Sequence, residues 1–531
     1  MPTRRLLLLV AGVSLCGVGA VWIVSDRSAL SAGSLAQLEP DVPYAVETAY
    51  DHATIDLTFD SRSRYVIIIG SLGDPNREHH VTLTARPIHR PVAAVVRRLA
   101  ALNSPIKSRA RQAVPTKTKP LIPTRSEGLI PSVIPLSHDD RRDKPDGSQQ
   151  LEHTLVDREF FLHASDGPLD HASEYTRLQA RLIAEGVNVR VYLDRRQPLQ
   201  KLASGLAEAI VRTLDTEIIP LFQRKLGRFR DVDGDGKLTV LLTPLLGRLQ
   251  GGTTSVEGFV RGDDFRSNIK VPFSNRCDMI YLNAHLTPGP HLKTILAHEF
   301  AHAVCFSERL PTERDRSARL DEEDWLNEAI AHVAENLADG DWSNLDDRLR
   351  DFLKAPESYP LVVPDYAQAG LWRNTGCRGA TYLFLRWCID QYGEELLPRL
   401  IHSRLRGIHN LAEATDHQAA QTGFPDLFRR WSIALYRSGL RSSAGMGDYQ
   451  SICLRGRVGR YHLRGPHARC WNVDAGEQTV RLSGTAVTYL KLRASGQTGP
   501  RRIRISGGFG SGLQISIVAC RSAERSALQN R

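Results

Sequence analysis

A long segment of this chain lacks aromatic residues. Between Pro87 and Gln150 there is no Phe, Tyr or Trp, although 7% of the 531 residues are aromatic. The segment is rich in proline and positive charge. Such a composition buries too little apolar surface to offset the entropy of ordering, so we predict that residues 87–150 form a basic, Pro-rich, disordered linker. Because part of the net charge of +10 lies there without rings for bases to stack on, we expect no nucleic-acid partner.

Long hydrophobic runs are also scarce, and the clearest one is at the N-terminus. Residues 6–24 are uncharged and largely apolar, and they follow Arg4 and Arg5. This pattern predicts that residues 1–27 are a signal peptide or a membrane anchor, with residues 6–24 as the membrane tether. We therefore expect the protein to be extracytoplasmic, either secreted or anchored. The sequence leaves open whether the signal is cleaved and whether residues 37–150 are a removed pro-region.

Cysteines are few, and an oxidising compartment would give them a structural role. Of the eight cysteines, Cys16 lies in the hydrophobic run. The other seven are Cys277, Cys305, Cys377, Cys388, Cys453, Cys470 and Cys520. They permit up to three disulfide bonds, and a bridge from Cys453 to Cys470, closing a short loop, is the pairing we favour.

The most informative motif is His-Glu-Phe-Ala-His at residues 298–302. Two histidines four residues apart are separated by about 400° of helical turn, so both imidazoles project from one face and clamp a metal. Glu299 lies about 100° from His298 around the helix, where it reaches a metal-bound water. The motif predicts a zinc site with hydrolytic chemistry. The alternative is an ordinary buried helix with two hydrogen-bonded core histidines.

A third zinc ligand is expected from the segment 321–335. Its acidic start suits a helix N-terminus, and Glu328, His332 and Glu335 share one face of that helix. A catalytic zinc takes three protein ligands and keeps one position for water, and Glu328 is our predicted third ligand. Cys305 lies on much the same face as His302, but a site closed by a thiolate would not need Glu299.

These two segments resemble a known family. HEFAH, followed after 22 residues by WLNEAIAH, is similar to the gluzincin metallopeptidases, and particularly to the hyicolysin-type branch, in which a turn like Asp231–Lys237 and a strand precede the motif. The likeness spans about residues 185 to 440. It implies that His298, His302 and Glu328 bind zinc and that Glu299 is the catalytic base. It also implies a mixed sheet with the HExxH helix, followed by a helical lobe.

Two departures from the family pattern affect the surroundings of the metal. His332 stands where thermolysin-like members have an aspartate, and Ala329 replaces the usual glycine. His332, Tyr366 and Tyr382 are unranked candidates for supporting the ligands or stabilising the oxyanion. The metzincin pattern is excluded, because Glu308 occupies the position of its third histidine.

The acidic turn at residues 231–237 partly resembles a calcium-binding loop. Asp231, Asp233 and Asp235 copy the first half of an EF-hand calcium loop, but Leu242 stands where such a loop has its bidentate glutamate. Calcium would therefore need ligands from elsewhere, and a tight acidic turn is the interpretation we prefer.

The hydrophobic patterns predict an α+β multidomain protein, and the family resemblance implies that its core is a gluzincin-like metallopeptidase. Residues 40–86 and 442–531 alternate in the manner of strands and are predicted to form two separate β-sandwich-like modules. Between them we expect the core with its zinc site at residues 151–360 and a helical lobe at 361–441.

The function expected is that of an exported, monomeric zinc metalloendopeptidase that hydrolyses peptides or proteins with a water activated by Glu299. Two alternatives remain. One is a surface binding protein on a metallopeptidase scaffold that does not cleave. The other is a zinc hydrolase of a non-peptide bond, which the same triad would support.

Overall fold

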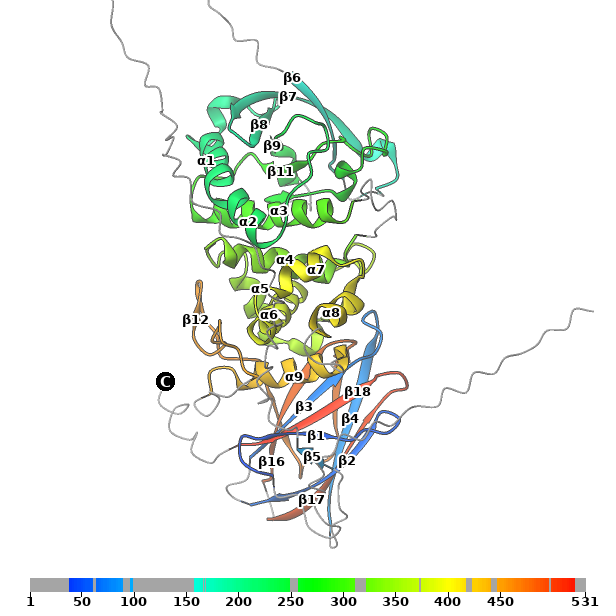
Figure 1. Ribbon diagram of the computed structural model, residues 1–531. Coiled ribbons are helices and arrows are strands. Elements are labelled where there is room, and N and C mark those ends of the chain that lie inside the picture. The colour runs from blue at the N-terminus through cyan, green and yellow to red at the C-terminus, as the bar shows by residue number, and fades with distance from the viewer. Residues whose placement is uncertain are drawn as a thin grey trace, which may run out of the picture.

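The computed structural model describes residues 38–60, 64–88, 96–98, 157–165, 167, 169–248, 256–310, 321–371, 374–416, 423–440, 447–495 and 498–520. These residues form a mixed α and β structure in three tiers, a sheet with its helices, a helical layer and a β-sandwich (Figure 1). This arrangement is compatible with the predicted multidomain organisation.

The first tier is a six-stranded mixed sheet with the order β10-β11-β9-β8-β7-β6. Its strands are β6 (Asp157–His163), β7 (Tyr175–Glu185), β8 (Val189–Asp194), β9 (Leu238–Thr243), β10 (Gly258–Phe259) and β11 (Met279–Asn283). Strands β8, β9 and β11 run parallel, and every residue of β9 and β11 is buried. Such continuous apolar runs are typical of strands covered on both faces.

One long helical stretch between β8 and β9 is divided. It consists of α1 (Leu206–Thr213), a π-helical turn (Leu214–Ile218) and α2 (Ile219–Lys225). Pro220 lies in the first turn of α2, where its missing N–H costs least. A proline inside an apolar helical pattern favours a break, and the π-helical turn lies directly before α2.

The motif-bearing helix α3 (Pro290–Glu308) follows β11 and begins with a proline after Gly289. It is buried around most of its circumference, and it packs against α4 (Asp324–Leu337). The helical layer continues with α5 (Asp346–Lys354), α6 (Thr375–Tyr392), α7 (Leu396–His402), α8 (Gly407–Asp416) and α9 (Phe424–Arg437). Helix α6 packs against both α4 and α5, so the site between α3 and α4 has a firm support.

The third tier is a sandwich built from both ends of the chain (Figure 1). Its two sheets have the orders β14-β16-β3-β18-β1-β5 and β15-β4-β17-β2. The N-terminal strands are β1 (Pro43–Val46), β2 (His52–Phe59), β3 (Tyr65–Ser71), β4 (Glu78–Pro87) and β5 (Val96–Arg98). The C-terminal strands are β14 (Arg469–Asn472), β15 (Gln478–Ser483), β16 (Val487–Arg493), β17 (Gly499–Gly507) and β18 (Leu513–Ala519). A small hairpin of β12 (Arg457–Val458) and β13 (Tyr461–His462) precedes them.

The prediction of two separate β modules is therefore wrong. Strand β3 lies between β16 and β18, and β4 lies between β15 and β17. Neither segment completes a sheet by itself, because β3 and β4 have both of their neighbours in the C-terminal segment, and β17 and β18 have both of theirs in the N-terminal segment. The alternation of apolar residues showed which side chains point inward, but not which strands pair.

Helix α9 joins the sandwich to the helical layer. A Cβ atom on Gly70 of β3 would lie 2.6 Å from Phe428 of α9, so this position needs a glycine for the two elements to approach. The hydroxyl of Tyr489 on β16 donates to the backbone oxygen of Ser432 at 2.9 Å. Val66, Val487 and Tyr489 belong to the same hydrophobic cluster as the helices. The second and third tiers thus share one core.

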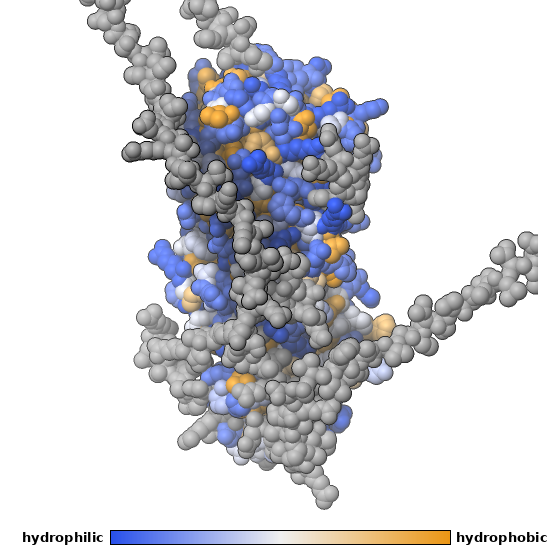
Figure 2. Space-filling view, in the orientation of Figure 1, coloured by the Kyte–Doolittle hydropathy of each residue, from blue (hydrophilic) through white to orange (hydrophobic). Residues whose placement is uncertain are grey.

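Several predictions concern segments beyond those described. The signal or anchor at residues 1–27 lies outside them, and so does most of the predicted linker at 87–150. Within that linker, β5 pairs with β1, so these three residues belong to the sandwich. Among the described residues, no helix combines the length and apolarity needed to cross a membrane. The coloured surface visible in Figure 2 is mostly hydrophilic, with scattered hydrophobic residues.

The predicted disulfide bonds are absent from the structure, because none of the seven cysteines that it describes is bonded to another. Four of them, Cys277, Cys305, Cys377 and Cys388, are buried core residues. Cys470 lies exposed on the edge strand β14, whereas the sulfur of Cys453 lies close to Gly439 after α9. Short separation in sequence suggested this pair, but the fold places the two residues in different local environments.

Candidate metal centre

Helix α3 presents both histidines of the motif to the same point. Nε2 of His302 lies 3.2 Å from Nε2 of His298, and the two rings meet edge to face with centroids 4.8 Å apart. Both side chains are buried, with 5% and 8% of their surface exposed. The four-residue spacing therefore produces the convergent pair of nitrogens that the sequence predicted.

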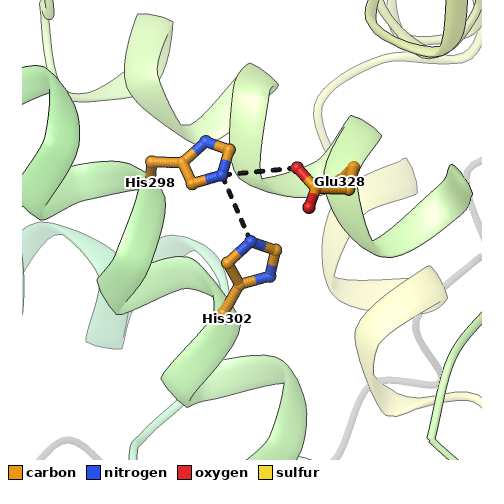
Figure 3. Close-up of side chains that lie close together, drawn as sticks. All are labelled: His298, His302 and Glu328. Atoms are coloured by element: carbon orange, nitrogen blue, oxygen red, sulfur yellow. Dashed lines mark hydrogen bonds and ion pairs between the residues drawn. The ribbon is translucent and has the colours of Figure 1, made fainter. Parts of the chain in front are cut away.

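Glu328 approaches this pair from α4 (Figure 3). Its Oε2 lies 3.4 Å from Nε2 of His298, and the three side chains form a group whose ligand atoms are all mutually close. Two ligands bound to one tetrahedral zinc at ~2.0 Å lie roughly 3.3 Å from each other. The separations of 3.2 and 3.4 Å match this value. The buried Oε2 makes no hydrogen bond among the described residues, as expected for an oxygen that coordinates a cation. The residues therefore fit zinc.

Arg378 on α6 holds the other oxygen of Glu328. Its guanidinium lies 3.0 Å from Oε1 of Glu328. Burial would raise the pKa of Glu328, but the charge of Arg378 and the close approach of His298 outweigh burial and keep this pKa well below its usual value. The carboxylate is thus charged and oriented. No motif in the sequence indicates Arg378, because α6 carries no recognisable site pattern of its own.

Glu335, about two helical turns beyond Glu328, accepts three hydrogen bonds at Oε1. Nδ1 of His298 lies at 2.8 Å, Nδ1 of His332 at 2.7 Å and Nδ2 of Asn344 at 2.6 Å. Burial would raise the pKa of Glu335, but the electrostatic interaction with His332 and the hydrogen bonds from both histidines lower it to about 2. Because Nδ1 of His298 bonds to Glu335, Nε2 remains directed towards His302 and Glu328.

His298, His332 and Glu335 also lie close enough together to form a ligand group. Their facing atoms are, however, already joined by the hydrogen bonds to Glu335. Burial lowers the pKa of His332 to about 4, so this ring is neutral. Its Nε2 lies 4.0 Å from Oε2 of Glu328 and has no hydrogen-bond partner among the described residues. The structure thus brings His332 to the border of the site, beside the third ligand.

Glu299 is buried beside the histidine pair, with 5% of its surface exposed. Burial, opposed by the charge of His298, raises the pKa of Glu299 to about 7. The edge strand β10 passes close to it, and a Cβ on Gly258 would lie 3.0 Å from Cγ and Oε1 of Glu299. The missing side chain at Gly258 therefore leaves the space that this carboxyl group occupies. No sequence motif indicated this contact.

The two candidate tyrosines differ in their surroundings. The hydroxyl of Tyr382 donates to Oδ1 of Asn336 at 2.6 Å, so it already has a partner on α4. The hydroxyl of Tyr366 is buried without a hydrogen-bond partner among the described residues, and Arg378 lies 6.0 Å from its ring. Cys305 is not in any group of potential metal ligands in the described chain, and burial raises the pKa of its thiol to about 12.

The acidic turn is arranged differently from the calcium loop considered above. Asp231 and Asp233 group with Asp278, which lies directly before β11, and not with Asp235. Asp235 instead accepts hydrogen bonds from Arg190 and from the backbone N–H of Lys237. The prediction of Asp235 as a third calcium ligand is therefore not supported by its position.

No protein-family model matches this chain. The chain is 26% identical over 173 residues to the neutral metalloprotease ShpI of Staphylococcus hyicus. The match covers 31% of this chain and 37% of that protein, so the aligned part is well under half of either. This partial similarity to a metalloprotease supports a metal-dependent protease relationship in general terms, and it agrees with the cluster of His and Glu ligands.

Proposed function

We propose that this protein is a zinc metallopeptidase of the gluzincin type, with His298, His302 and Glu328 as metal ligands and Glu299 as the base. The observation that carries the proposal is that Nε2 of His298 lies 3.2 Å from Nε2 of His302 and 3.4 Å from Oε2 of Glu328, beside the buried carboxyl group of Glu299. The partial similarity to a neutral metalloprotease supports it independently.

The chemistry divides between the ion and the side chains. When bound, zinc supplies a Lewis acid that lowers the pKa of a coordinated water and polarises a carbonyl group. Glu299 accepts the proton of that water at its carboxylate and returns it to the nitrogen of the leaving amine. Arg378 and Glu335 hold Glu328 and His298 in their binding orientation through the contacts described above.

The substrate class follows from strand β10. This strand ends the first-tier sheet and pairs only with β11 among the described residues. An extended peptide binds to such an edge by adding a further strand, with backbone hydrogen bonds that do not depend on side chains. Because Gly258 of β10 lies next to Glu299, a peptide added there would place its carbonyl groups near the base. This favours a peptide over a non-peptide substrate.

The second candidate is a binding protein that retains the scaffold without cleaving. The presence of the carboxyl group of Glu299 beside the histidine pair argues against it, since binding of zinc alone requires no base. We further propose, from the N-terminal sequence, that the protein acts outside the cytoplasm, and separately that it is a monomer. Fractionation of the producing cells and light scattering of the purified chain would test these two points.

The decisive experiment compares the full chain with its Glu299→Gln variant on a quenched peptide library. We expect cleavage by the wild type, loss of cleavage with a zinc chelator, and restoration by added zinc. Glu299→Gln should keep stoichiometric zinc and lose at least ~100-fold in kcat/KM, since one proton-transfer group contributes on this scale. Glu394→Gln, at a surface pair with Lys225, is the control and should remain active. A zinc-loaded wild type that cleaves nothing would favour the binding protein.

A further inference from the structure

We propose that Asp231, Asp233 and Asp278 form a second cation site, separate from the zinc centre, that binds calcium and fixes the turn before β9 to the start of β11. This proposal does not depend on the proposed peptidase activity. It differs from an EF-hand loop, because the third carboxylate, Asp278, lies directly before β11 and not in the loop itself.

The geometry of the three carboxylates suits one ion. Each contributes an oxygen, and these oxygens all lie within 4.8 Å of one another. Calcium binds oxygens at about 2.4 Å, so two oxygens of the same ion lie no more than roughly 4.8 Å apart. Gly234 and Gly236 have positive φ values of 77° and 74°, which allow the turn to curl around its own carboxylates.

Asp278 provides the observation that points to a ligand. Its side chain is completely buried, with 0% exposed. Its Oδ1 accepts a hydrogen bond from the backbone N–H of Val232 at 2.9 Å, whereas Oδ2 is buried without any hydrogen-bond partner among the described residues. A buried carboxylate oxygen without a partner is costly, and a cation shared with two more carboxylates would remove that cost. Burial, and then the charges of Asp233 and Asp231, also raise the pKa of Asp278 to about 8.

The other contacts of the cluster leave room for a cation. Oδ1 and Oδ2 of Asp231 accept hydrogen bonds from the N–H groups of Gly234 and Gly236, at 2.8 and 3.1 Å, and each oxygen keeps a second lone pair. Oδ2 of Asp233 pairs with Arg158 at 2.8 Å. Arg158 offsets only one of the three negative charges. Because the positive charge of Arg158 lies beside the proposed calcium, we expect the affinity for calcium to be modest.

The donors favour calcium over a softer metal. All three side chains offer carboxylate oxygens, which suit hard cations, and the exposure of Asp231 and Asp233 gives water access to the group. The neighbouring Cys277 is not part of the group, and burial holds the pKa of its thiol well above the usual value, so it does not offer a thiolate.

The position of the site gives it a structural role. The backbone N–H of Thr239 on β9 donates to the backbone oxygen of Asp278, and the N–H of Arg230 donates to Oγ of Ser307 on α3. The turn therefore connects β9, β11 and the helix that carries the zinc-binding histidines. A cation at this point would stabilise the support of α3 without touching substrate.

The test is calorimetric titration of the zinc-saturated full chain with calcium chloride, together with melting curves in calcium and in magnesium. We expect one calcium per chain, with a Kd of roughly 10⁻⁵ to 10⁻³ M, and a higher melting temperature in calcium. Asp278→Asn and Asp231→Asn should each weaken binding at least ~10-fold, as expected when a site loses one ligand charge. Asp235→Asn is the matched control from the same turn and should bind as the wild type does.

Three results would overturn the proposal. They are a wild type that does not bind calcium at millimolar concentration, an Asp235→Asn variant that loses binding as strongly as Asp231→Asn, and an Asp278→Asn variant that keeps wild-type affinity. The absence of binding together with a stable Asp278→Asn variant would identify Asp278 as a protonated core residue. If Asp278→Asn does not fold, the calcium affinities of the wild type and of Asp231→Asn, which changes an exposed residue, decide between binding and no binding. Glu328→Ala should retain calcium binding, which separates this site from the zinc centre.

Discussion

Glu335 and His298 are joined by a hydrogen bond of 2.8 Å between Oε1 and Nδ1, on the side of the ring opposite to the proposed zinc. The bond determines which nitrogen of His298 carries the proton and directs Nε2 towards His302. Glu335 is fully buried and lies on α4, the helix that also carries Glu328. Helix α4 therefore supplies one proposed zinc ligand, Glu328, and orients a second one, His298. This coupling between α3 and α4 leads to the first prediction.

Glu335→Gln should weaken zinc binding by ~10-fold to 100-fold, the usual effect of losing a carboxylate behind a metal-bound histidine. The amide is uncharged, and it replaces one of the two acceptor oxygens with a donor while the N–H groups of His298 and His332 still face it. The measurement is competition for zinc against a coloured chelator. Glu394→Gln, on the surface, should leave the affinity unchanged. Equal affinities in the two variants would show that Glu335 has no role in holding the ligand.

Gly258→Ala should reduce cleavage while leaving zinc in place. The added Cβ would lie 3.0 Å from Glu299 and equally close to Leu282, so the carboxyl group or the strand must shift by a few tenths of an ångström. Because small displacements of a reacting group are costly, we expect kcat/KM to fall at least ~10-fold. Gly508→Ala is the control, since its Cβ would meet nothing within 4 Å. Full activity of Gly258→Ala would separate β10 from the function of Glu299.

The third prediction concerns which cysteine thiols react with a thiol reagent. In the native protein without reductant, a thiol reagent should modify the exposed Cys453 and Cys470, while the four buried cysteines react only after denaturation. Burial raises the pKa of Cys305 and of Cys377 to about 12, which removes the reactive thiolate as well as the access. Mass spectrometry of the labelled peptides is the readout. If Cys453 and Cys470 react only after reduction, the bridge suggested by the sequence exists.

The sequence predicted the parts of the site that depend on local spacing. The helical spacing of α3 sets the relative positions of His298, Glu299 and His302. The spacing of α4 does the same for Glu328, His332 and Glu335. A helix determines such relationships within a few residues, so they can be derived without knowing the fold. The meeting of α3 with α4 was inferred from the chemistry of zinc, and the separation of 3.4 Å between His298 and Glu328 fits that inference.

The remaining parts depend on tertiary contacts that no local pattern encodes. Arg378 reaches Glu328 from α6, and Gly258 reaches Glu299 from an edge strand. Asp278 joins Asp231 because β11 pairs in parallel with β9, whereas sequence proximity had suggested Asp235. The same limitation explains the error about the two β modules. Their residue alternation identified inward faces, but pairing between strands hundreds of residues apart is decided by the whole fold.

The final prediction concerns the dependence of the sandwich on both chain ends. A chain that ends at residue 440 keeps β1 to β5 but loses both neighbours of β3 and both neighbours of β4. It also removes Tyr489, which stacks on Tyr436 of α9 with ring centroids 5.9 Å apart. Unpaired strands and an uncovered apolar helix face promote aggregation, so we expect this truncated chain to be insoluble.

Coexpression of residues 447–531 as a separate chain provides the matched test, because it restores the missing strands without restoring the covalent connection. We expect the two fragments to form a soluble complex that copurifies, and Tyr489→Ala in the shorter fragment to weaken that complex, since it removes a buried ring and its hydrogen bond to Ser432. Solubility and size-exclusion chromatography are the measurements. A truncated chain that is soluble by itself and binds zinc like the full protein would mean that the N-terminal strands and helices fold without the C-terminal strands, contrary to the shared core described above.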